Sequence, residues 1–274
     1  MLAGRYHSGS NEPLVLLFIS FGLLMGSCYI INQLADKEGD SLNQKLYFIA
    51  DGHISWDAAV ITAGFAALLG DIGLLFVDLQ FALIGVLFFI IAGIMYNLHP
   101  FRLKDHPVFG PLVSIFGGGV AFTLGVLPYF DGIHLLMMIP YLLAIGAVSV
   151  LTTVPDMEGD RATAKQTLAV KIGPGRTSIA ALIMCLGAVI MSWWLQDRIL
   201  FWPALLSLPL FFYASVKLDR SSVILAIKFP IFILSLAVGF RFPVYLLLMA
   251  IYFVFARWYY SRRFKMEYPS FKLQ

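Results

Sequence analysis

One five-residue pattern, Asp-x-Glu-Gly-Asp, occurs twice in this sequence, at residues 36–40 and again at residues 156–160. Six of the 16 acidic residues of the chain therefore lie in two copies of the same pattern. Each copy places two aspartates four positions apart, and Asn32 stands four positions before the first of them. Side chains at this spacing share one face of a helix, so each motif can present several oxygen atoms to one bound cation.

The chemistry that suits these motifs is the binding of a hard divalent cation. Mg²⁺ prefers oxygen ligands and is typically held by one or two carboxylates together with phosphate oxygens of a substrate. No Cys or His accompanies either motif, which disfavours a transition-metal site. We therefore expect Asp36, Asp40, Asp156 and Asp160 to bind Mg²⁺ on a diphosphate. Solvated acidic loops at a membrane edge are the alternative, and the repetition of the motif weighs against it.

Basic residues follow both acidic motifs closely. Lys45 comes after the first copy, Arg161 and Lys165 come after the second, and the segment between them contributes Arg102 and Lys104. Arg binds phosphate oxygens as a bidentate fork and Lys binds them as a point charge. We expect these five residues to contact the diphosphate, although basic residues also occur in membrane loops simply because they set the topology.

The rest of the chain must position these groups within a membrane. The sequence of 274 residues is 60% hydrophobic and 13% charged, with a mean hydropathy of +0.85, which excludes a soluble protein. A membrane-spanning helix needs about 20 apolar residues. Nine segments meet this requirement: 13–34, 57–77, 81–98, 108–129, 134–154, 177–196, 200–216, 221–240 and 243–259. The fold class expected is an all-α transmembrane bundle of about nine helices in one domain, residues 1–274.

The distribution of basic residues predicts how this bundle is oriented. Of the 19 Lys and Arg residues, 15 fall on one side when the predicted spans are counted along the chain. By the positive-inside rule that side is cytoplasmic. Four spans separate the two acidic motifs, so both motifs are expected on this side. We predict an integral protein of the cytoplasmic (inner) membrane whose site faces the cytoplasm.

These motifs together resemble those of the UbiA superfamily of intramembrane prenyltransferases. Asn32, Asp36 and Asp40 are similar to the family pattern Asn-x-x-x-Asp-x-x-x-Asp, and Asp156 with Asp160 matches its Asp-x-x-x-Asp. The segment 96–104 resembles the Tyr-containing Arg-x-Lys loop of many members, and residues 167–173 resemble the segment after the second motif. The resemblance covers about residues 14–240.

This resemblance implies a bundle around a central cavity that is open sideways to lipid. Members transfer an isoprenyl group from a prenyl diphosphate to a lipophilic or aromatic acceptor, with two Mg²⁺ ions held by the two motifs. Carried over, the four aspartates are metal ligands and Asn32 contacts metal or diphosphate. Tyr96, Arg102, Lys104 and Lys165 then line the diphosphate and acceptor end. The expected partners are these two substrates and the lipid bilayer, and no nucleic acid.

The sequence departs from the family pattern in three places. In the family a further helix precedes the span before the first motif, whereas here only one predicted span does, so we expect that helix to be missing from this sequence. The span 243–259 has no counterpart in the usual nine-helix pattern. Pro100 stands where some members place a Lys, which bears on the roles of Arg102 and Lys104.

Two other functions fit a membrane bundle with clustered acids. A transporter generally places its substrate site near the middle of the bilayer, whereas the charged residues here lie at the ends of the predicted spans. A CDP-alcohol phosphotransferase also uses aspartates and a divalent metal, but in one compact segment rather than in two motifs separated by four spans. Both alternatives are therefore weaker than the prenyltransferase interpretation.

Overall fold

The computed structural model describes residues 1–9, 15–36, 49, 52–265 and 267–268, and every regular element within these ranges is helical. The elements are α1 (Leu2–Ser8), α2 (Val15–Ala35), α4 (Trp56–Val77), α5 (Leu79–Phe88), the π-helix η1 (Phe89–Met95), the short 3₁₀ helix η2 (Leu103–Asp105), α6 (Phe109–Val126), α7 (Gly132–Thr152), α8 (Met157–Ala162), α9 (Leu168–Ile172), α10 (Pro174–Trp194), α11 (Arg198–Lys217), α12 (Arg220–Arg241) and α13 (Pro243–Phe264). The all-α fold class is confirmed.

The nine segments expected to span the membrane are all helical. Eight of them, α2, α4, α6, α7, α10, α11, α12 and α13, are long and apolar enough to cross a bilayer. The ninth, expected at 81–98, is the shorter apolar stretch Leu79–Met95, in which α5 continues directly into η1. Before α2 the structure has the seven-residue helix α1, too short to span a membrane.

Acidic and hydroxyl side chains at the turns fix where several helices begin. The Asp78 carboxylate accepts a hydrogen bond from the backbone N–H of Gln80, and Ser55, Asp131, Asp197 and Asp219 cap α4, α7, α11 and α12 in the same way. Such N-caps satisfy backbone donors that a helix leaves unpaired at its start. Short polar turns therefore join the apolar helices as antiparallel neighbours.

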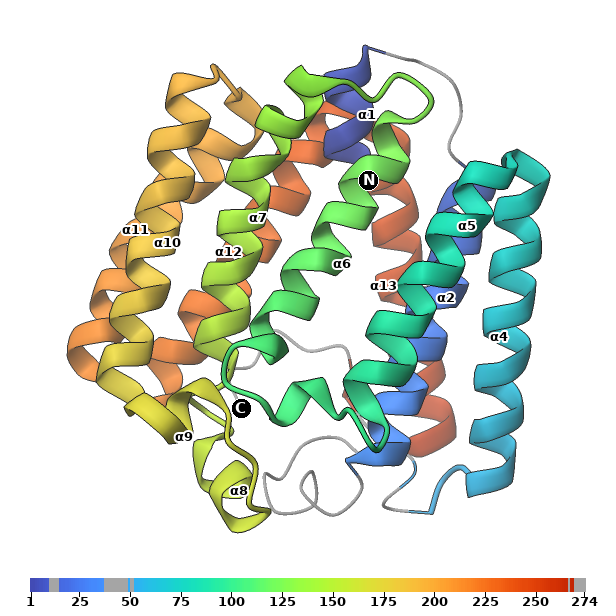
Figure 1. Cartoon of the computed structure of the whole chain (residues 1–274), viewed down its shortest axis with the longest axis horizontal. Coiled ribbons are helices and arrows are strands. Elements are labelled where there is room, and N and C mark those ends of the chain that lie inside the picture. The colour runs from blue at the N-terminus through green and yellow to red at the C-terminus, as the bar shows by residue number, and fades with distance from the viewer. Residues whose placement is uncertain (10–14, 37–48, 50–51, 266, 269–274) are drawn as a thin grey trace.

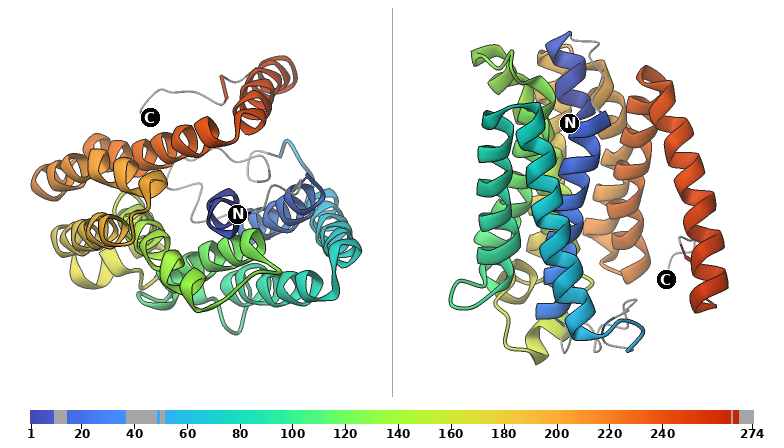
Figure 2. Two further views of the ribbon diagram at one scale, coloured as in Figure 1. Left: turned by 90° about the horizontal axis from the view of Figure 1, so that it is seen from above. Right: turned by 90° about the vertical axis from the view of Figure 1, so that its right-hand side faces the viewer.

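The helices pack mainly against neighbours in the sequence. Helix α2 packs against α4, α6 against α7, and α7 against α10 and α12, while α10 and α12 also pack against α11. The short elements α8, α9 and η2 lie at one end of the bundle, which we call the α8 end, and α1 lies at the opposite α1 end (Figure 1). Viewed from above, α1 lies near the middle of the bundle (Figure 2, left). The bundle thus has the short elements α8, α9 and η2 at one end and the short helix α1 at the other.

Candidate functional site

The second acidic motif is held by the short helix α8. Asp156 is the N-cap residue of α8, and its carbonyl accepts a hydrogen bond from the Asp160 N–H at 2.9 Å. The Asp160 side chain is buried, and its Oδ2 accepts a hydrogen bond from Thr167 Oγ1 at 3.0 Å. The expected i, i+4 relation of the two aspartates therefore exists on one helical turn.

The first acidic motif begins where α2 ends. Asp36 follows the last helical residue and is buried, and the Asn32 side-chain amide donates to its Oδ2 at 3.1 Å. Asn32 and Asp36 therefore form the polar stripe that their spacing predicts. Two other sequence-predicted residues, Asp40 and Lys45, lie outside the described residues.

The π-helix η1 presents two polar residues to the same place. Directly after η1 come Tyr96 and Asn97, and the Asn97 side-chain amide donates to the carbonyls of Ala92 and Gly93 at 3.2 and 2.9 Å. The Asn97 Oδ1 accepts from the Asn32 amide at 2.9 Å. π-helical turns are rare and are found frequently at functional sites. Here the turn holds a fully buried amide that orients Asn32.

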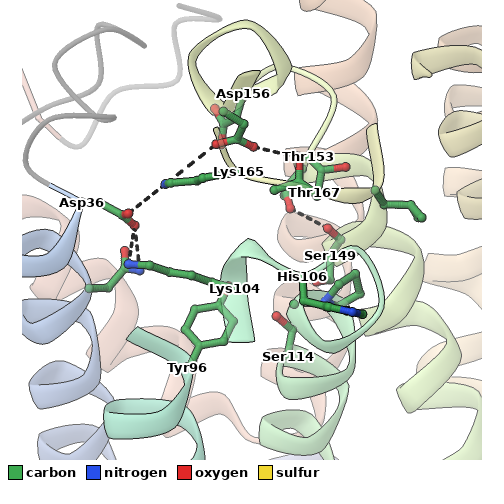
Figure 3. Close-up of a pocket in the computed structure, with 16 residues that line it drawn as sticks. Asp36, Tyr96, Lys104, His106, Ser114, Ser149, Thr153, Asp156, Lys165 and Thr167 are labelled. Carbon is green, nitrogen blue, oxygen red and sulfur yellow. Dashed lines mark hydrogen bonds and ion pairs between the residues drawn. The ribbon is translucent and has the colours of Figure 1, made fainter. Parts of the chain in front are cut away.

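Two lysines converge on Asp36 from different loops (Figure 3). Lys104 Nζ lies 2.8 Å from one carboxylate oxygen and Lys165 Nζ lies 2.8 Å from the other. Lys165 Nζ also lies 3.8 Å from Asp160 Oδ1, so one ammonium stands between the two acidic motifs. Lys104 additionally donates to the Asn97 Oδ1 at 3.3 Å. The folded chain thus brings the two motifs to opposite sides of a single positive charge.

The electrostatics of this cluster follow from burial and from the arrangement of charges. Burial by itself raises the pKa of Asp36, but Lys104 and Lys165 outweigh that effect and hold its pKa below the usual value. Burial lowers the pKa of both lysines. For Lys165, the nearby carboxylates of Asp36, Asp160 and Asp105 outweigh the effect of burial and raise its pKa. For Lys104, the carboxylate of Asp36 does not outweigh the combined effect of burial and of the neighbouring cations Lys165 and Arg102, so its pKa is lowered.

These groups line a polar cavity of about 230 Å³ at the α8 end. Its lining residues are Asn32, Asp36, Tyr96, Lys104, His106, Gly110, Pro111, Ser114, Ser149, Thr152, Thr153, Asp156, Asp160, Lys165, Thr167 and Leu168. Two apolar cavities share lining residues with it. The first, about 390 Å³, is lined mainly by α7, α10, α11 and α12 and shares Ser114, Ser149 and Thr152 with the polar cavity. The second, about 440 Å³, is lined mainly by α2, α5, η1 and α6 and shares Asn32, Tyr96 and Ser114 with it. A charged compartment therefore opens onto hydrocarbon-lined space.

The structure brings together most, but not all, of the residues that the sequence predicts for the site. Asn32, Asp36, Tyr96, Lys104, Asp156, Asp160 and Lys165 all line the polar cavity. Two predicted residues do not line it. Arg102 forms an ion pair with Asp105 at 2.8 Å, and Arg161 is exposed to solvent. A single sequence shows that these arginines are near the motif but not which way they point.

Several residues in or beside the cavity were not predicted as site residues. Asn97 contacts Asn32 and Lys104, and Thr167 donates to Asp160. His106, Ser114 and Ser149 line the wall. The signal for Asn97 is its position beside Tyr96 at the end of an apolar segment. His106 accepts hydrogen bonds from the backbone N–H groups of Val108 and Phe109 through Nδ1, at 3.3 and 3.4 Å, so the neutral ring carries its proton on Nε2. The serines carried no sequence signal, because hydroxyls are common in membrane helices.

The donor set fits Mg²⁺ shared with a diphosphate better than a metal held by protein alone. Among the residues that the structure describes, no group of three or more His, Cys, Asp or Glu side chains is arranged to hold an ion. The two motifs instead present separate carboxylates across a gap spanned by Lys165. Mg²⁺ commonly binds through one or two carboxylates, with substrate phosphates and water completing its shell. These residues therefore fit an ion that arrives with its diphosphate.

Fold and site together define an integral membrane protein whose charged cavity suits an anionic head group attached to a hydrocarbon chain. The chain belongs to the UbiA prenyltransferase family, whose model matches residues 1–222. This membership confirms the resemblance seen in the motifs, and it favours the prenyltransferase interpretation over the transporter and the phosphotransferase.

Individual relatives agree with the family assignment. The chain is 29% identical over 177 residues to the digeranylgeranylglyceryl phosphate synthase of Methanobrevibacter smithii, with 62% of each chain aligned. It is 28% identical over 189 residues to the homogentisate phytyltransferase of Synechocystis, covering 62% of this chain and 59% of that one. The chain thus spans about 60% of the length of these curated relatives.

A solved structure shares the fold. The UbiA homolog from Archaeoglobus fulgidus bound to GPP and Mg²⁺ has a TM-score of 0.68 at 21% identity, over 89% of this chain and 94% of that one.

Proposed function

We infer that the protein transfers an isoprenyl group from a prenyl diphosphate to a lipophilic or aromatic acceptor within the membrane and releases diphosphate. The observation that carries this inference is the junction of cavities: carboxylates of both acidic motifs and two lysines line a polar compartment that shares walls with two apolar cavities. A prenyl diphosphate has the same division, with a charged head and a hydrocarbon tail.

The diphosphate end would be bound by the groups that already converge on one another. Asp36, Asp156 and Asp160 would hold Mg²⁺, with Asp40 as a fourth ligand by its place in the motif. When bound, Mg²⁺ neutralises charge that develops on the leaving diphosphate. We propose two ions, because the carboxylates form two sets separated by Lys165. The solved relative with GPP and Mg²⁺ supports a divalent metal for this chain as well.

The lysines and their neighbours would orient the diphosphate oxygens. Lys104 and Lys165 supply positive charge within the cavity, and Asn97 fixes both Asn32 and Lys104 through its side-chain oxygen. Charge-assisted hydrogen bonds of this kind are the strong ones in a partly buried site. By position, Lys45, Arg102 and Arg161 are weaker candidates for the same role.

The prenyl carbon would react at the entrance to the apolar space. As the carbon–oxygen bond breaks, its electron pair leaves with the diphosphate and positive charge develops on the allylic carbon. Tyr29 lines both apolar cavities and Tyr96 lines the polar cavity and one apolar cavity, so aromatic side chains belong to the walls near which that cation would form. Aromatic rings attract cations, and an apolar wall excludes water that would capture the cation. The acceptor then forms the new bond and loses a proton.

The acceptor is proposed only as a class. One relative is named for a glycerol phosphate lipid product and another for homogentisate, an aromatic acceptor. The wall of the polar cavity offers hydroxyl donors from Ser114 and Ser149 and the Nε2–H of His106, which suit either an anionic or a phenolic acceptor. We propose that the α8 end faces the cytoplasm of the inner membrane, because 15 of the 19 basic residues belong to that side.

The test is Mg²⁺-dependent prenyl transfer by purified protein in lipid vesicles. Radiolabelled geranyl, farnesyl or geranylgeranyl diphosphate is supplied with a membrane-lipid extract and, separately, with aromatic acceptors. We expect diphosphate release and a labelled lipid-soluble product, both abolished by EDTA and by Asp160→Ala. Glu158→Ala is the matched control, since Glu158 belongs to the same helix α8 but is exposed and does not line the cavity. Equal activity in Asp160→Ala and Glu158→Ala would contradict the proposal.

A further inference from the structure

The apolar cavity beside α7, about 390 Å³ in volume, is a long chamber that follows one face of that helix. Its lining residues on α7 recur at helical spacing, from Thr152 through Ser149, Val148, Ile145 and Ala144 to Tyr141. At 1.5 Å per residue this face extends for roughly 16 Å from the polar cavity. On α11 the lining residues extend in parallel from Phe211 to Leu200. The chamber thus begins at the charged site and extends toward the α1 end.

Aromatic rings pack behind the far end of this chamber. The Tyr141 ring lies with its centroid 5.4 Å from that of Phe122 and 5.9 Å from that of His7. Tyr141, Phe122 and Leu200 belong to one buried cluster, against which Ala3 of α1 also packs. Tyr141 and Leu200 are therefore both wall residues of the chamber and members of the core that closes it.

Polar contacts hold this closing group in place. His7 Nε2 lies 3.4 Å from the Tyr141 hydroxyl and 3.1 Å from Asp197 Oδ2. The other Asp197 oxygen accepts from the backbone N–H of Leu200 at 3.2 Å, which fixes the start of α11. Both residues at the end of the chamber, Tyr141 and Leu200, are thus tied to the same His7–Asp197 pair. A chamber wall that is held by buried hydrogen bonds is more rigid than a wall made only of aliphatic side chains.

We propose that Tyr141 is the residue that sets the length of the isoprenoid chain that the protein accepts. This inference rests on the proposed function. The prenyl tail occupies the chamber beside α7 with its diphosphate in the polar cavity, and its last unit meets the Tyr141 ring. A donor with more isoprene units must displace a ring that is packed against His7 and Phe122.

The test compares donors of different length in single-residue variants. Tyr141→Ala removes the ring and is expected to raise the ratio of kcat/KM for geranylgeranyl over geranyl diphosphate by about tenfold, the lower limit of what one misfitted hydrocarbon unit costs in a binding pocket. Tyr141→Phe keeps the ring and loses only the hydroxyl, so its ratio is expected to stay within about twofold of the unchanged protein. The same ratio in Tyr141→Ala as in the unchanged protein would overturn the proposal.

For a second variant we predict the opposite shift in donor preference. Ala144 lines the chamber one turn nearer to the polar cavity, so Ala144→Phe places a ring in the path of the chain and should shift the preference toward geranyl diphosphate. This variant decides the question if Tyr141→Ala does not fold. Donor preference unchanged by Ala144→Phe would contradict the assignment of the chamber to the prenyl tail. If the unchanged protein transferred no donor at all, the proposed function itself would fail, which is a separate outcome.

Discussion

Two buried polar clusters lie at opposite ends of the bundle and differ in what surrounds them. At the α8 end, Asp36 meets Lys104 and Lys165 on the wall of a cavity. At the α1 end, Asp197 accepts hydrogen bonds from His7 and from two backbone N–H groups at the start of α11, and its side chain is completely shielded from solvent.

From this difference we expect that the Asp36 cluster serves ligand binding and that Asp197 serves the stability of the fold. The oxygens of Asp197 are occupied by groups of the chain that hold two elements together, α1 and α11. The partners of Asp36 are two lysine ammonium groups on the wall of a cavity, where we propose that phosphate oxygens of the substrate bind. We therefore expect substitutions at the α8 end to change activity and substitutions at the α1 end to change stability.

The largest effect should come from Asp36→Asn, which keeps the size of the side chain and removes its charge. The two lysines would then face each other without their shared carboxylate, and one metal ligand would be lost. We expect kcat/KM for prenyl transfer to fall about a hundred- to thousandfold, as for the loss of one group that stabilises the transition state. The measurement is Mg²⁺-dependent product formation by protein that elutes as a single peak in detergent. Retention of a third of the activity would remove Asp36 from the site.

At the α1 end, Asp197→Ala should lower the free energy of unfolding by about 2–4 kcal/mol, because a helix cap and the hydrogen bond to His7 are lost together. Thermal unfolding in detergent measures this change. Asp219→Ala is the matched control: it removes the exposed N-cap of α12, which is expected to cost about 1 kcal/mol. Transfer from geranyl diphosphate per folded molecule should stay within about threefold in both. An Asp197→Ala protein that is stable but inactive would reverse the comparison.

A smaller effect is expected from Asn97→Leu, which replaces a buried amide with an apolar side chain of similar size. Asn32 and Lys104 would lose the oxygen that orients them. Groups that orient ligands from behind typically contribute about tenfold or more to metal affinity or activity. The readout is the Mg²⁺ concentration required for half-maximal transfer, which should rise. An unchanged Mg²⁺ requirement would make Asn97 a purely structural residue.

The smallest effect should come from Arg161→Ala, since Arg161 is exposed and does not line the cavity. We expect a change in stability within about 0.5 kcal/mol, as for surface substitutions in general, and transfer activity within about twofold. Lys165→Met, four residues further along, is the comparison variant and should lower kcat/KM by about tenfold or more, since it removes a charge-assisted contact. Equal effects of the two substitutions would show that loop charge alone, rather than the position of Lys165, supports activity.

The spans and the acidic motifs could be predicted because both signals are local in the sequence. An apolar run of about 20 residues forms a helix in lipid whatever its neighbours are, since its backbone groups must pair internally. The segments expected at 57–77 and 243–259 agree with α4 and α13 to within five residues at each end. Likewise, the i, i+4 spacing places Asn32 beside Asp36 and Asp156 beside Asp160 without any tertiary contact.

Other features of the site depend on contacts between distant parts of the chain. The sequence placed Arg102, Lys104, Arg161 and Lys165 near the motifs equally, and only the fold shows that the two lysines reach the cavity whereas the two arginines do not line it. Asn97 gained its role from a π-helical turn that hydropathy does not reveal. Asp40 and Lys45, predicted from the first motif, lie outside the described residues, and their roles stay predictions.

The sequence by itself determined the membrane class, the nine helical segments and the two acidic motifs, because hydropathy and helical spacing act over one or two turns. The tertiary structure decided that Lys165 stands between Asp36 and Asp160, residues separated by 124 positions, and that His7 of α1 contacts both Tyr141 and Asp197. Such contacts arise from the packing of whole helices, which depends on many weak interactions spread over the bundle. A short stretch of sequence therefore does not predict them.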